Sequence, residues 1–228
     1  MNLTRKKILI TGATGFIGGR LIEELMLNHD VEIRTLVRDF KTASRIARFN
    51  IKMVASDLSE IKPIELACKD CDIVINCAHD FSSSIAENTQ RIENLISVTA
   101  NHGARLVHLS TIDVYGWPDV EEIKETTHQN TNRNKYAETK YKIEETIHRS
   151  QIKDNLSSVI LQPTIVYGPY SLPWTISPVT QLKNGKVVLP NDGKGISNTL
   201  YVDDLVQAII LSCTNDKVLG ETFLISGQ

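Results

Sequence analysis

The chain has 228 residues, and 25 lysine and arginine residues against 27 aspartate and glutamate residues give a formal net charge of −2. This charge excludes a generally basic protein that coats nucleic acid. With 41% hydrophobic and 23% charged residues, the composition is that of an ordinary folded domain, so we expect one domain with a self-sufficient core.

The predicted elements alternate between short strands and longer helices, which is the signature of βαβ units. Strands are expected at 7–11, 31–37, 51–55, 72–77, 106–110 and 158–162, and helices at 15–28, 41–49, 84–102 and 135–153. Several strands are apolar on both faces, as in IVIN and LVHL, which is typical of a parallel sheet with helices on both sides. The predicted fold class is therefore α/β, with a doubly wound parallel sheet.

The texture of the chain changes after Pro163, because five of the seven prolines lie between Pro163 and Pro190. We divide the chain into a core at 1–162 and a loop-rich, substrate-side segment at 163–228 that ends in a closing helix and strand of the same domain. Ligands bind at the carboxyl edge of open α/β sheets, so this segment is expected to face a ligand. Plain connection is the alternative.

Cysteine usage and apolar runs indicate where the protein works. Four cysteines, three of them clustered, are too few for a disulfide framework, which favours a reducing compartment. The basic start is followed by only three apolar residues before Thr11 and Gly12, so no signal peptide is predicted. No run reaches the roughly 18 to 20 apolar residues of a membrane span. We expect a cytoplasmic protein without a membrane or nucleic-acid partner.

Three glycines lie in the turn that joins the first strand to the first helix. Gly12 permits a tight turn, Gly15 lets the backbone approach a pyrophosphate, and Gly18 lets the helix pack closely on the strand. The N–H groups at the helix start then face the phosphates. We predict a dinucleotide site here, with a plain tight turn as the alternative. The cofactor-binding residues predicted on this turn are Gly12, Thr14, Gly15, Phe16, Ile17 and Gly18.

The end of the second strand bears on which dinucleotide binds. NAD-binding folds place an acid there for the ribose hydroxyls, whereas an arginine accommodates the 2′-phosphate of NADP. Val37 stands at the place of the acid and Arg38 follows it, so NADP is favoured, with NAD as the alternative cofactor. Arg45 is a candidate for a second phosphate contact. In the alternative interpretation both arginines are solvated and Asp39 is the acid on the ribose.

Tyr136 and Lys140 are four residues apart in a helical pattern, and thus one turn apart on one face. A free phenol has a pKa of about 10, and a neighbouring ammonium and a nicotinamide cation both favour its ionised form. The lysine can also hydrogen-bond the cofactor ribose. The pair is common on exposed helices, but Ser110 and Thr111 end a strand at the sheet edge where open α/β folds build their sites.

The runs TGATGFIG, LSTIDVYG, YAETK, LQPTIVYGP and YVDDL resemble, in order and spacing, the successive motifs of the extended short-chain dehydrogenase/reductase family of NAD(P)-dependent epimerases and dehydratases. The resemblance extends from about residue 7 to the end. It implies a Rossmann-type sheet and a nicotinamide cofactor. It also implies that Tyr136 is the acid/base, that Lys140 is its modulator and ribose ligand, and that Thr111 is the catalytic threonine.

The same resemblance implies further cofactor contacts. Asp57 and Leu58 would lie along the adenine, and the backbone of Cys77 and Ala78 would pass the cofactor. Three residues after the strand at 158–162 would meet the nicotinamide end, namely Pro163, Ile165 and Val166.

Three departures from the family pattern affect what is expected. Dehydratases usually have acids directly after the threonine, whereas Ile112 follows Thr111 here and only Asp113 is acidic, so a standard sugar-nucleotide dehydratase is disfavoured. Gln162 stands where an arginine commonly precedes Pro163. Family members often run to about 300 residues, which is still within the range of a single domain, whereas this chain has 228. A small or truncated substrate lobe is therefore expected.

We expect an enzyme that moves a hydride between nicotinamide and a carbonyl or carbinol carbon of a nucleotide sugar or another small polar substrate. Retained cofactor gives net epimerisation, and released cofactor gives reduction. The alternative is a nicotinamide-nucleotide-binding regulatory or interaction protein without turnover. No metal is expected, because Cys68 and Cys71 lack a second pair at zinc spacing. A homodimer is also expected.

Overall fold

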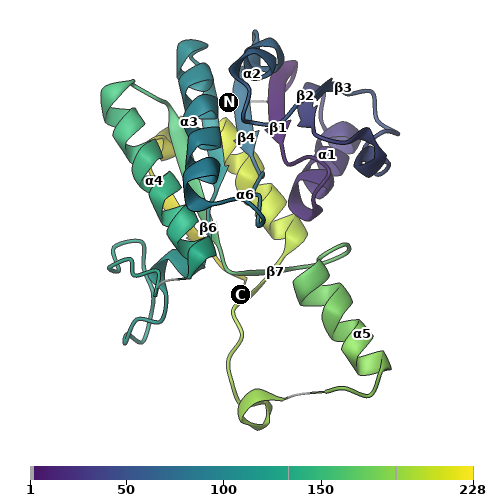
Figure 1. Ribbon diagram of the computed structural model, residues 1–228, viewed down its shortest axis with the longest axis vertical. Coiled ribbons are helices and arrows are strands. Elements are labelled where there is room, and N and C mark those ends of the chain that lie inside the picture. The colour runs from purple at the N-terminus through teal and green to yellow at the C-terminus, as the bar shows by residue number, and fades with distance from the viewer. Residues whose placement is uncertain (1–2, 133, 188, 228) are drawn as a thin grey trace.

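A seven-stranded parallel sheet forms the centre of the computed structural model, which describes residues 3–132, 134–187 and 189–227 (Figure 1). The strand order is β3-β2-β1-β4-β5-β6-β9. Its strands are β1 (Lys6–Thr11), β2 (Val31–Val37), β3 (Lys52–Ala55), β4 (Ile73–Asn76), β5 (Arg105–Leu109), β6 (Ser158–Pro163) and β9 (Thr222–Ile225). The helices are α1 (Phe16–Asn28), α2 (Ile61–Cys68), α3 (Ile85–Asn101), α4 (Lys135–Lys153), α5 (Ser177–Lys183) and α6 (Val202–Thr214).

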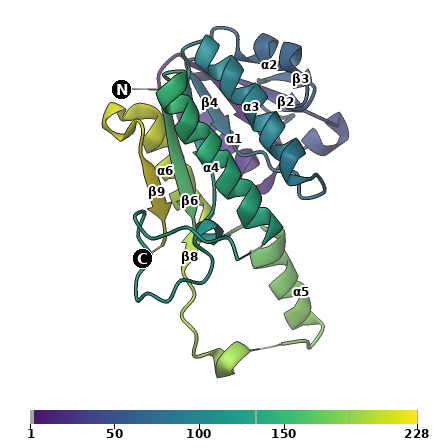
Figure 2. The ribbon, with the colours of Figure 1, turned by 60° about the vertical axis from the view of Figure 1, so that its left-hand side comes forward.

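Alternate residues of the central strands enter two separate apolar cores, one on each face of the sheet. Ile8 and Ile10 of β1 pack with residues of α1 and α6, whereas Leu9 packs with residues of α2, α3 and α4. All three side chains are fully buried. Figure 2 shows α3 and α4 side by side along one face. The predicted doubly wound parallel sheet is confirmed, because only helices on both faces bury strands that are apolar on both sides.

Polar side chains at the helix starts explain where α3 and α4 begin. The Ser84 hydroxyl accepts a hydrogen bond from the Glu87 N–H, and the Glu87 carboxylate accepts one from the Ser84 N–H, which is a capping box. The Asn134 side chain accepts hydrogen bonds from the N–H groups of Tyr136 and Ala137. Two otherwise unpaired donors are satisfied at each helix start, so the register of each helix is fixed locally.

Two local predictions differ from the structure. The helix expected at 41–49 is only a 3₁₀ turn, Phe40–Ala43, followed by irregular turns. The Asp39 side chain and carbonyl accept hydrogen bonds from Lys41 and Thr42, and such local bonds compete with a continuing helix. Helix α2 is not predicted from the sequence. It has eight residues, has no side-chain cap and carries Pro63 in its first turn. Proline is tolerated there because that N–H needs no helical partner.

The C-terminal quarter of the chain returns to the main sheet. Helix α6 packs beside α1, and β9 pairs with β6. Between them, β7 (Ile165–Tyr167) and β8 (Thr199–Tyr201) form a small parallel pair. Helix α5 contributes no buried side chain and extends away from the sheet (Figure 1). The boundary at 162 and 163 stays a prediction.

Among the described residues, none of the helices combines the length and the apolar character needed to cross a membrane. The cytoplasmic location and the homodimer stay predictions.

The turn from β1 to α1 lies in close contact with the end of β4. Gly12 has φ +70°, and a Cβ there would meet the Cys77 carbonyl carbon and the Ala78 nitrogen at 2.7 Å. A Cβ on Gly18 would overlap the Gly12 carbonyl oxygen. Because these neighbours are backbone atoms of sheet and turn, they cannot move aside cheaply. Both glycines are required for packing.

Gly12→Ala is expected to lower the free energy of unfolding by on the order of 3 kcal/mol, because strain at positive φ adds to an overlap with fixed backbone. Urea unfolding measures the change. Gly103→Ala is the matched control, since Gly103 has φ +64° with open space around the Cβ position. It is expected to lose only about 1 kcal/mol, the cost of the positive φ alone. Equal losses in the two variants would contradict the close-approach argument.

Candidate functional site

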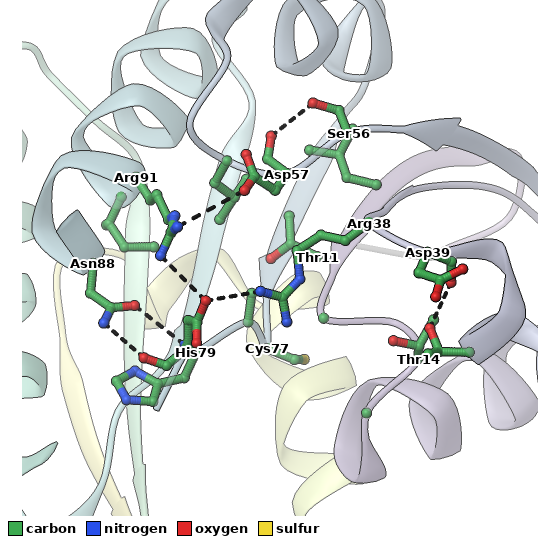
Figure 3. Close-up of a pocket in the computed structure, with 18 of the residues that line it drawn as sticks. Thr11, Thr14, Arg38, Asp39, Ser56, Asp57, Cys77, His79, Asn88 and Arg91 are labelled. Carbon is green, nitrogen blue, oxygen red and sulfur yellow. Dashed lines mark hydrogen bonds and ion pairs between the residues drawn. The ribbon is translucent and has the colours of Figure 1, made fainter. Parts of the chain in front are cut away.

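A cavity of about 560 Å³ lies at the carboxyl edge of the sheet, between β1 and β4, where the strand order reverses. Open α/β sheets bind ligands at this switch point. The turn after β1 and the loop after β2 line one side of the cavity, and the start of α3 lines the opposite side (Figure 3). The lining residues that sequence analysis predicted are Gly12, Thr14, Gly15, Arg38, Asp57, Leu58, Cys77 and Ala78.

The glycine turn presents bare backbone to the cavity. Gly12, Thr14 and Gly15 line it, and α1 begins directly after Gly15 without a side-chain cap. The first N–H groups of the helix are therefore not used by a capping side chain, and a helix N-terminus attracts anions. Phe16, Ile17 and Gly18 do not line the cavity. Phe16 and Ile17 instead pack against the core, and Gly18 packs on the Gly12 carbonyl.

Residues that follow β2 and β3 form the far end of the cavity, away from His79. Arg38 and Asp39 follow β2, and Asp57 and Leu58 follow β3. Leu58 is 6% exposed and supplies an apolar wall, on which an adenine ring can pack. Both arrangements considered for the ribose remain open, because the side chains of Arg38 and Asp39 both reach the cavity.

Arg45 is not a second phosphate contact. Its guanidinium donates hydrogen bonds to both carboxylate oxygens of Glu23, at 2.9 and 2.8 Å, and to the Phe16 carbonyl at 3.3 Å. The Tyr170 ring covers the guanidinium, with its centroid 4.2 Å from the guanidinium carbon. Arg45 therefore fixes α1 to the segment after β2, and it lies outside the cavity lining. The sequence prediction for Arg45 was wrong because a buried carboxylate on α1 was not foreseen.

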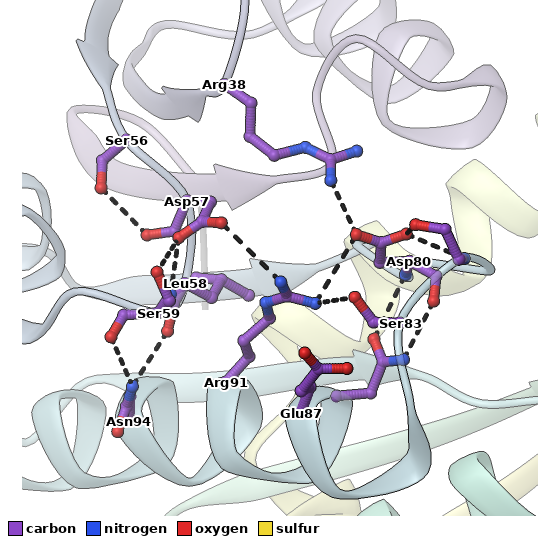
Figure 4. Close-up of polar contacts among 12 residues, drawn as sticks. Arg38, Ser56, Asp57, Leu58, Ser59, Asp80, Ser83, Glu87, Arg91 and Asn94 are labelled. Carbon is purple, nitrogen blue, oxygen red and sulfur yellow. Dashed lines mark hydrogen bonds and ion pairs between the residues drawn. The ribbon is translucent and has the colours of Figure 1, made fainter.

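Two arginines and two aspartates alternate along the cavity wall (Figure 4). Arg38 Nη1 lies 2.9 Å from Asp80 Oδ2, Arg91 lies 3.6 Å from the same oxygen, and Arg91 also lies 3.9 Å from Asp57 Oδ2. Hydrogen bonds from Ser82 hold the pKa of Asp80 well below its usual range, and Arg38 contributes. Burial acts to raise the pKa of Asp57, but hydrogen bonds from Ser59 and the charge of Arg91 outweigh it. Both aspartates are ionised at neutral pH.

The end of β4 connects the cavity to the catalytic residues. The Cys77 N–H donates to the Thr11 carbonyl at 3.1 Å, which holds the two strand ends together. Burial raises the pKa of the Cys77 thiol to about 12, so the thiol is neutral. His79 lines the cavity, and its ring packs edge-on against Tyr136 with 4.9 Å between centroids. Burial and the charge of Lys140 lower the pKa of His79 to about 4, so this ring is also neutral.

Tyr136, Thr111 and Lys140 come together at the end of β5 and the start of α4. Burial raises the pKa of Tyr136 to about 12, the charge of Asp113 adds to the rise, and hydrogen bonding with Thr111 opposes it. The Phe81 ring stacks on Tyr136 with 5.3 Å between centroids. In this arrangement the phenol is protonated at neutral pH. The ionised phenol was expected from the lysine together with a nicotinamide cation, and the effect of that combination stays a prediction.

Lys140 is 4% exposed, and its ammonium donates a hydrogen bond to the Leu109 carbonyl at 2.6 Å. The Nζ atom lies 6.0 Å from the Tyr136 ring centroid. Burial lowers the pKa of Lys140 to about 8, against the smaller opposing effects of Cys77 and Glu144. The ammonium is therefore mostly charged at neutral pH, at a cost to the folded state.

Near the predicted catalytic residues, Gln162 contacts a buried glutamate. Glu144 is 1% exposed and accepts hydrogen bonds from Ser110, from Gln129 at 2.8 Å and from Gln162 at 3.0 Å. The Tyr115 hydroxyl donates to the side-chain Oε1 of Gln162 at 2.7 Å. Every partner is neutral, so Gln162 satisfies the carboxylate without bringing a second charge.

Pro163, Ile165 and Val166 do not line the cavity. Pro163 ends β6, and Ile165 and Val166 lie in β7 opposite β8. Val166 is 8% exposed and packs in the core. Their contact with the nicotinamide end stays a prediction that rests on the resemblance.

The cavity lining also includes polar side chains that were not predicted as site residues, among them His79, Asp80 and Arg91. A signal existed for the first two, since they directly follow a strand that ends at the ligand edge. Arg91 lies within the predicted helix at 84–102, where a charged residue usually faces solvent, so the sequence carried no signal for it. Among residues 3–132, 134–187 and 189–227, no group of three or more histidine, cysteine, aspartate or glutamate side chains is placed to hold a metal ion.

Comparison with known proteins agrees with the geometry. The model of the NAD-dependent epimerase/dehydratase family matches residues 8–226, which is nearly the whole chain. The chain belongs to this family. Membership favours an enzyme over a binding protein without turnover.

Individual relatives are distant. The chain is 25% identical to the UDP-glucose 4-epimerase of Vibrio cholerae, over 97% of this chain and 70% of that protein. It is 27% identical to a decarboxylating sterol-4-alpha-carboxylate 3-dehydrogenase of Candida albicans, over 100% of this chain and 72% of that protein.

Solved structures share the fold. A dTDP-glucose 4,6-dehydratase from Bacillus anthracis, in complex with NAD, superposes with a TM-score of 0.86 at 22% identity, covering 98% of this chain and 76% of the other. A UDP-glucuronic acid 4-epimerase from Bacillus cereus, in complex with UDP-glucuronic acid and NAD, gives a TM-score of 0.85 at 21% identity, covering 97% and 78%.

Lys140→Met is expected to raise the free energy of unfolding at pH 7 by roughly 1 to 3 kcal/mol, because the removal of a buried charge outweighs the loss of one hydrogen bond. The pKa of Lys140 is lower in the folded state, about 8 against 10.5, so the cost of the charge is fully present below pH 8 and disappears as the pH rises toward 10.5. The advantage of the variant should therefore narrow between pH 8 and 10. Denaturant unfolding across this pH range measures the difference in free energy of unfolding between the variant and the wild type. A difference that stays constant with pH would argue against a lowered pKa of Lys140.

Proposed function

We propose that this protein is an NADP-preferring oxidoreductase or epimerase that acts on a carbonyl or carbinol carbon of a nucleotide sugar. The observation that carries the proposal is the continuity of the site. A glycine-turn cavity suited to a dinucleotide runs to His79, and His79 packs directly on Tyr136 beside Thr111. A dinucleotide bound in this cavity would have its nicotinamide end beside Tyr136, the proton donor.

The residues of the cavity fit a nicotinamide dinucleotide. Gly12 and Gly15 leave room for backbone to approach a pyrophosphate, the start of α1 supplies unused N–H groups, and Leu58 supplies an apolar wall. The nicotinamide, when bound, exchanges a hydride with the substrate carbon. The protein supplies binding, orientation and the matching proton.

Proton movement falls to Tyr136. With its pKa raised to about 12, the phenol is protonated at neutral pH, so it is ready to donate a proton to a substrate oxygen during reduction. The Thr111 hydroxyl holds that oxygen beside the phenol. Lys140, which the resemblance implies as a ribose ligand, would keep a positive charge near the phenol and favour the phenolate after the proton has left.

The substrate class rests on the relatives. The names of the epimerases and the dehydratase indicate nucleotide sugars, whereas the sterol dehydrogenase indicates an apolar substrate. The nucleotide sugar is preferred because more of these neighbours act on one, and UDP-glucose, dTDP-glucose and a sterol carboxylate should be assayed in parallel. Ile112 after Thr111 still disfavours dehydration.

Tyr136→Phe is expected to lower turnover by at least about a thousandfold and to leave the dissociation constant for the dinucleotide within about threefold of wild type, because only the proton donor is lost. Activity is followed by sugar interconversion or nicotinamide absorbance, and binding by calorimetry. Full activity in the variant would refute the mechanism. Binding without turnover in the wild type, across all substrates, would favour a regulatory protein instead.

Arg38→Ala is expected to weaken NADP binding about ten- to a hundredfold and NAD binding by less than about threefold, because a charge-assisted contact to the 2′-phosphate is lost. Arg48→Ala is the matched control, since Arg48 is also an exposed arginine but bonds Glu23 outside the cavity. An unchanged ratio of the two affinities in Arg38→Ala would refute the role given to Arg38.

A further inference from the structure

The arginine that would bind a 2′-phosphate already has an anionic partner inside the cavity. Arg38 comes from the end of β2 and Asp80 from the loop after β4, so their ion pair of 2.9 Å joins opposite sides of the switch point. Figure 4 shows Arg91 between Asp80 and Asp57 on the same wall. A 2′-phosphate that contacts Arg38 therefore has to compete with a carboxylate.

Asp80 is held in a fixed orientation. Its Oδ1 atom accepts hydrogen bonds from the Ser82 N–H at 3.0 Å and from the Ser82 hydroxyl at 2.6 Å. The Asn88 side chain accepts from the Asp80 N–H and donates to its carbonyl. These contacts leave Oδ2 as the oxygen that faces both arginines. The carboxylate cannot turn away when a second anion enters the cavity.

The two arginines differ in freedom. The Arg38 side chain is 64% exposed, whereas that of Arg91 is 21% exposed and donates to the Ser83 hydroxyl at 2.7 Å. A pair with one well-solvated partner contributes little to stability, so Arg38 can leave Asp80 readily. Arg91 then remains beside Asp80 and compensates its charge. The wall is arranged so that Arg38 is the group that moves.

We propose that Asp80 is a specificity-determining residue, which limits the preference for NADP over NAD by engaging Arg38. This inference rests on the proposed function of the cavity as a dinucleotide site. NADP gains the Arg38 contact only when Arg38 leaves Asp80, so the free energy of the lost ion pair offsets part of that contact. NAD carries a hydroxyl at the same position and leaves the ion pair intact. The chain accordingly accepts both cofactors, with a narrower ratio than Arg38 alone would give.

Asp80→Asn tests the proposal, because the amide keeps the size of the side chain and an oxygen that can accept from Ser82. Dissociation constants for NADP and NAD are measured by calorimetry on the whole protein. We expect NADP to bind about five- to tenfold more tightly than in the wild type, and NAD to change by less than about twofold. Asp70→Asn is the matched control, since Asp70 is an exposed aspartate at the opposite, amino edge of the sheet. It should leave the ratio unchanged.

The double variant Arg38→Ala/Asp80→Asn decides whether Asp80 acts through Arg38. We expect the effect of Asp80→Asn on the affinity ratio to fall to less than about twofold when Arg38 is absent. An effect of the same size in both backgrounds overturns the inference, because Asp80 would then act on the phosphate directly. An unchanged ratio in the single variant overturns it as well, while the proposed function stands. Failure of the wild type to bind either nucleotide overturns the proposed function and this inference together.

Discussion

The contact between the β1 to α1 turn and the end of β4 is the constraint on which the rest of the site depends. At Gly12 the chain reverses with positive φ while its backbone lies against that of Cys77 and Ala78. This contact directs the N-terminus of α1 into the space above the sheet. It also sets where the loop after β4 continues, and so where His79 and Asp80 stand. The position of the glycine turn, the contact between His79 and Tyr136, and the ion pairs of Asp80 thus all depend on this one contact.

The charged groups at the two ends of this site differ in how deeply they are buried and in whether they are paired with an opposite charge. At the far end, Arg38, Asp80, Arg91 and Asp57 are partly solvated and neutralise one another, so their arrangement can change at small cost. At the catalytic end, Lys140 is almost fully buried and its ammonium has a carbonyl as partner. A charge kept in such a place lowers stability, which is typical of sites maintained for chemistry.

Most of the fold was predictable because its signals are periodic and local. The doubly buried strands, the glycine turn and the pair Tyr136 and Lys140 each depend on residues within one or two elements. The failures depend on contacts between distant segments. Arg45, in the turns after β2, is held by Glu23 of α1, and Arg91 reaches the cavity from a helix face that was expected to be solvated. The raised pKa of Tyr136 likewise follows from burial that only the assembled structure provides.

The rings around Tyr136 also bear on how the proton is transferred. Phe81 covers one face of the phenol and His79 meets it edge-on, while Asn134 holds the backbone N–H of the same residue. Rotation of the ring about its side-chain bonds is therefore restricted before any ligand arrives. The orientational entropy that a proton donor loses in a transition state is then lost during folding instead. In the proposed mechanism, an arriving substrate therefore meets a proton donor whose direction is already set.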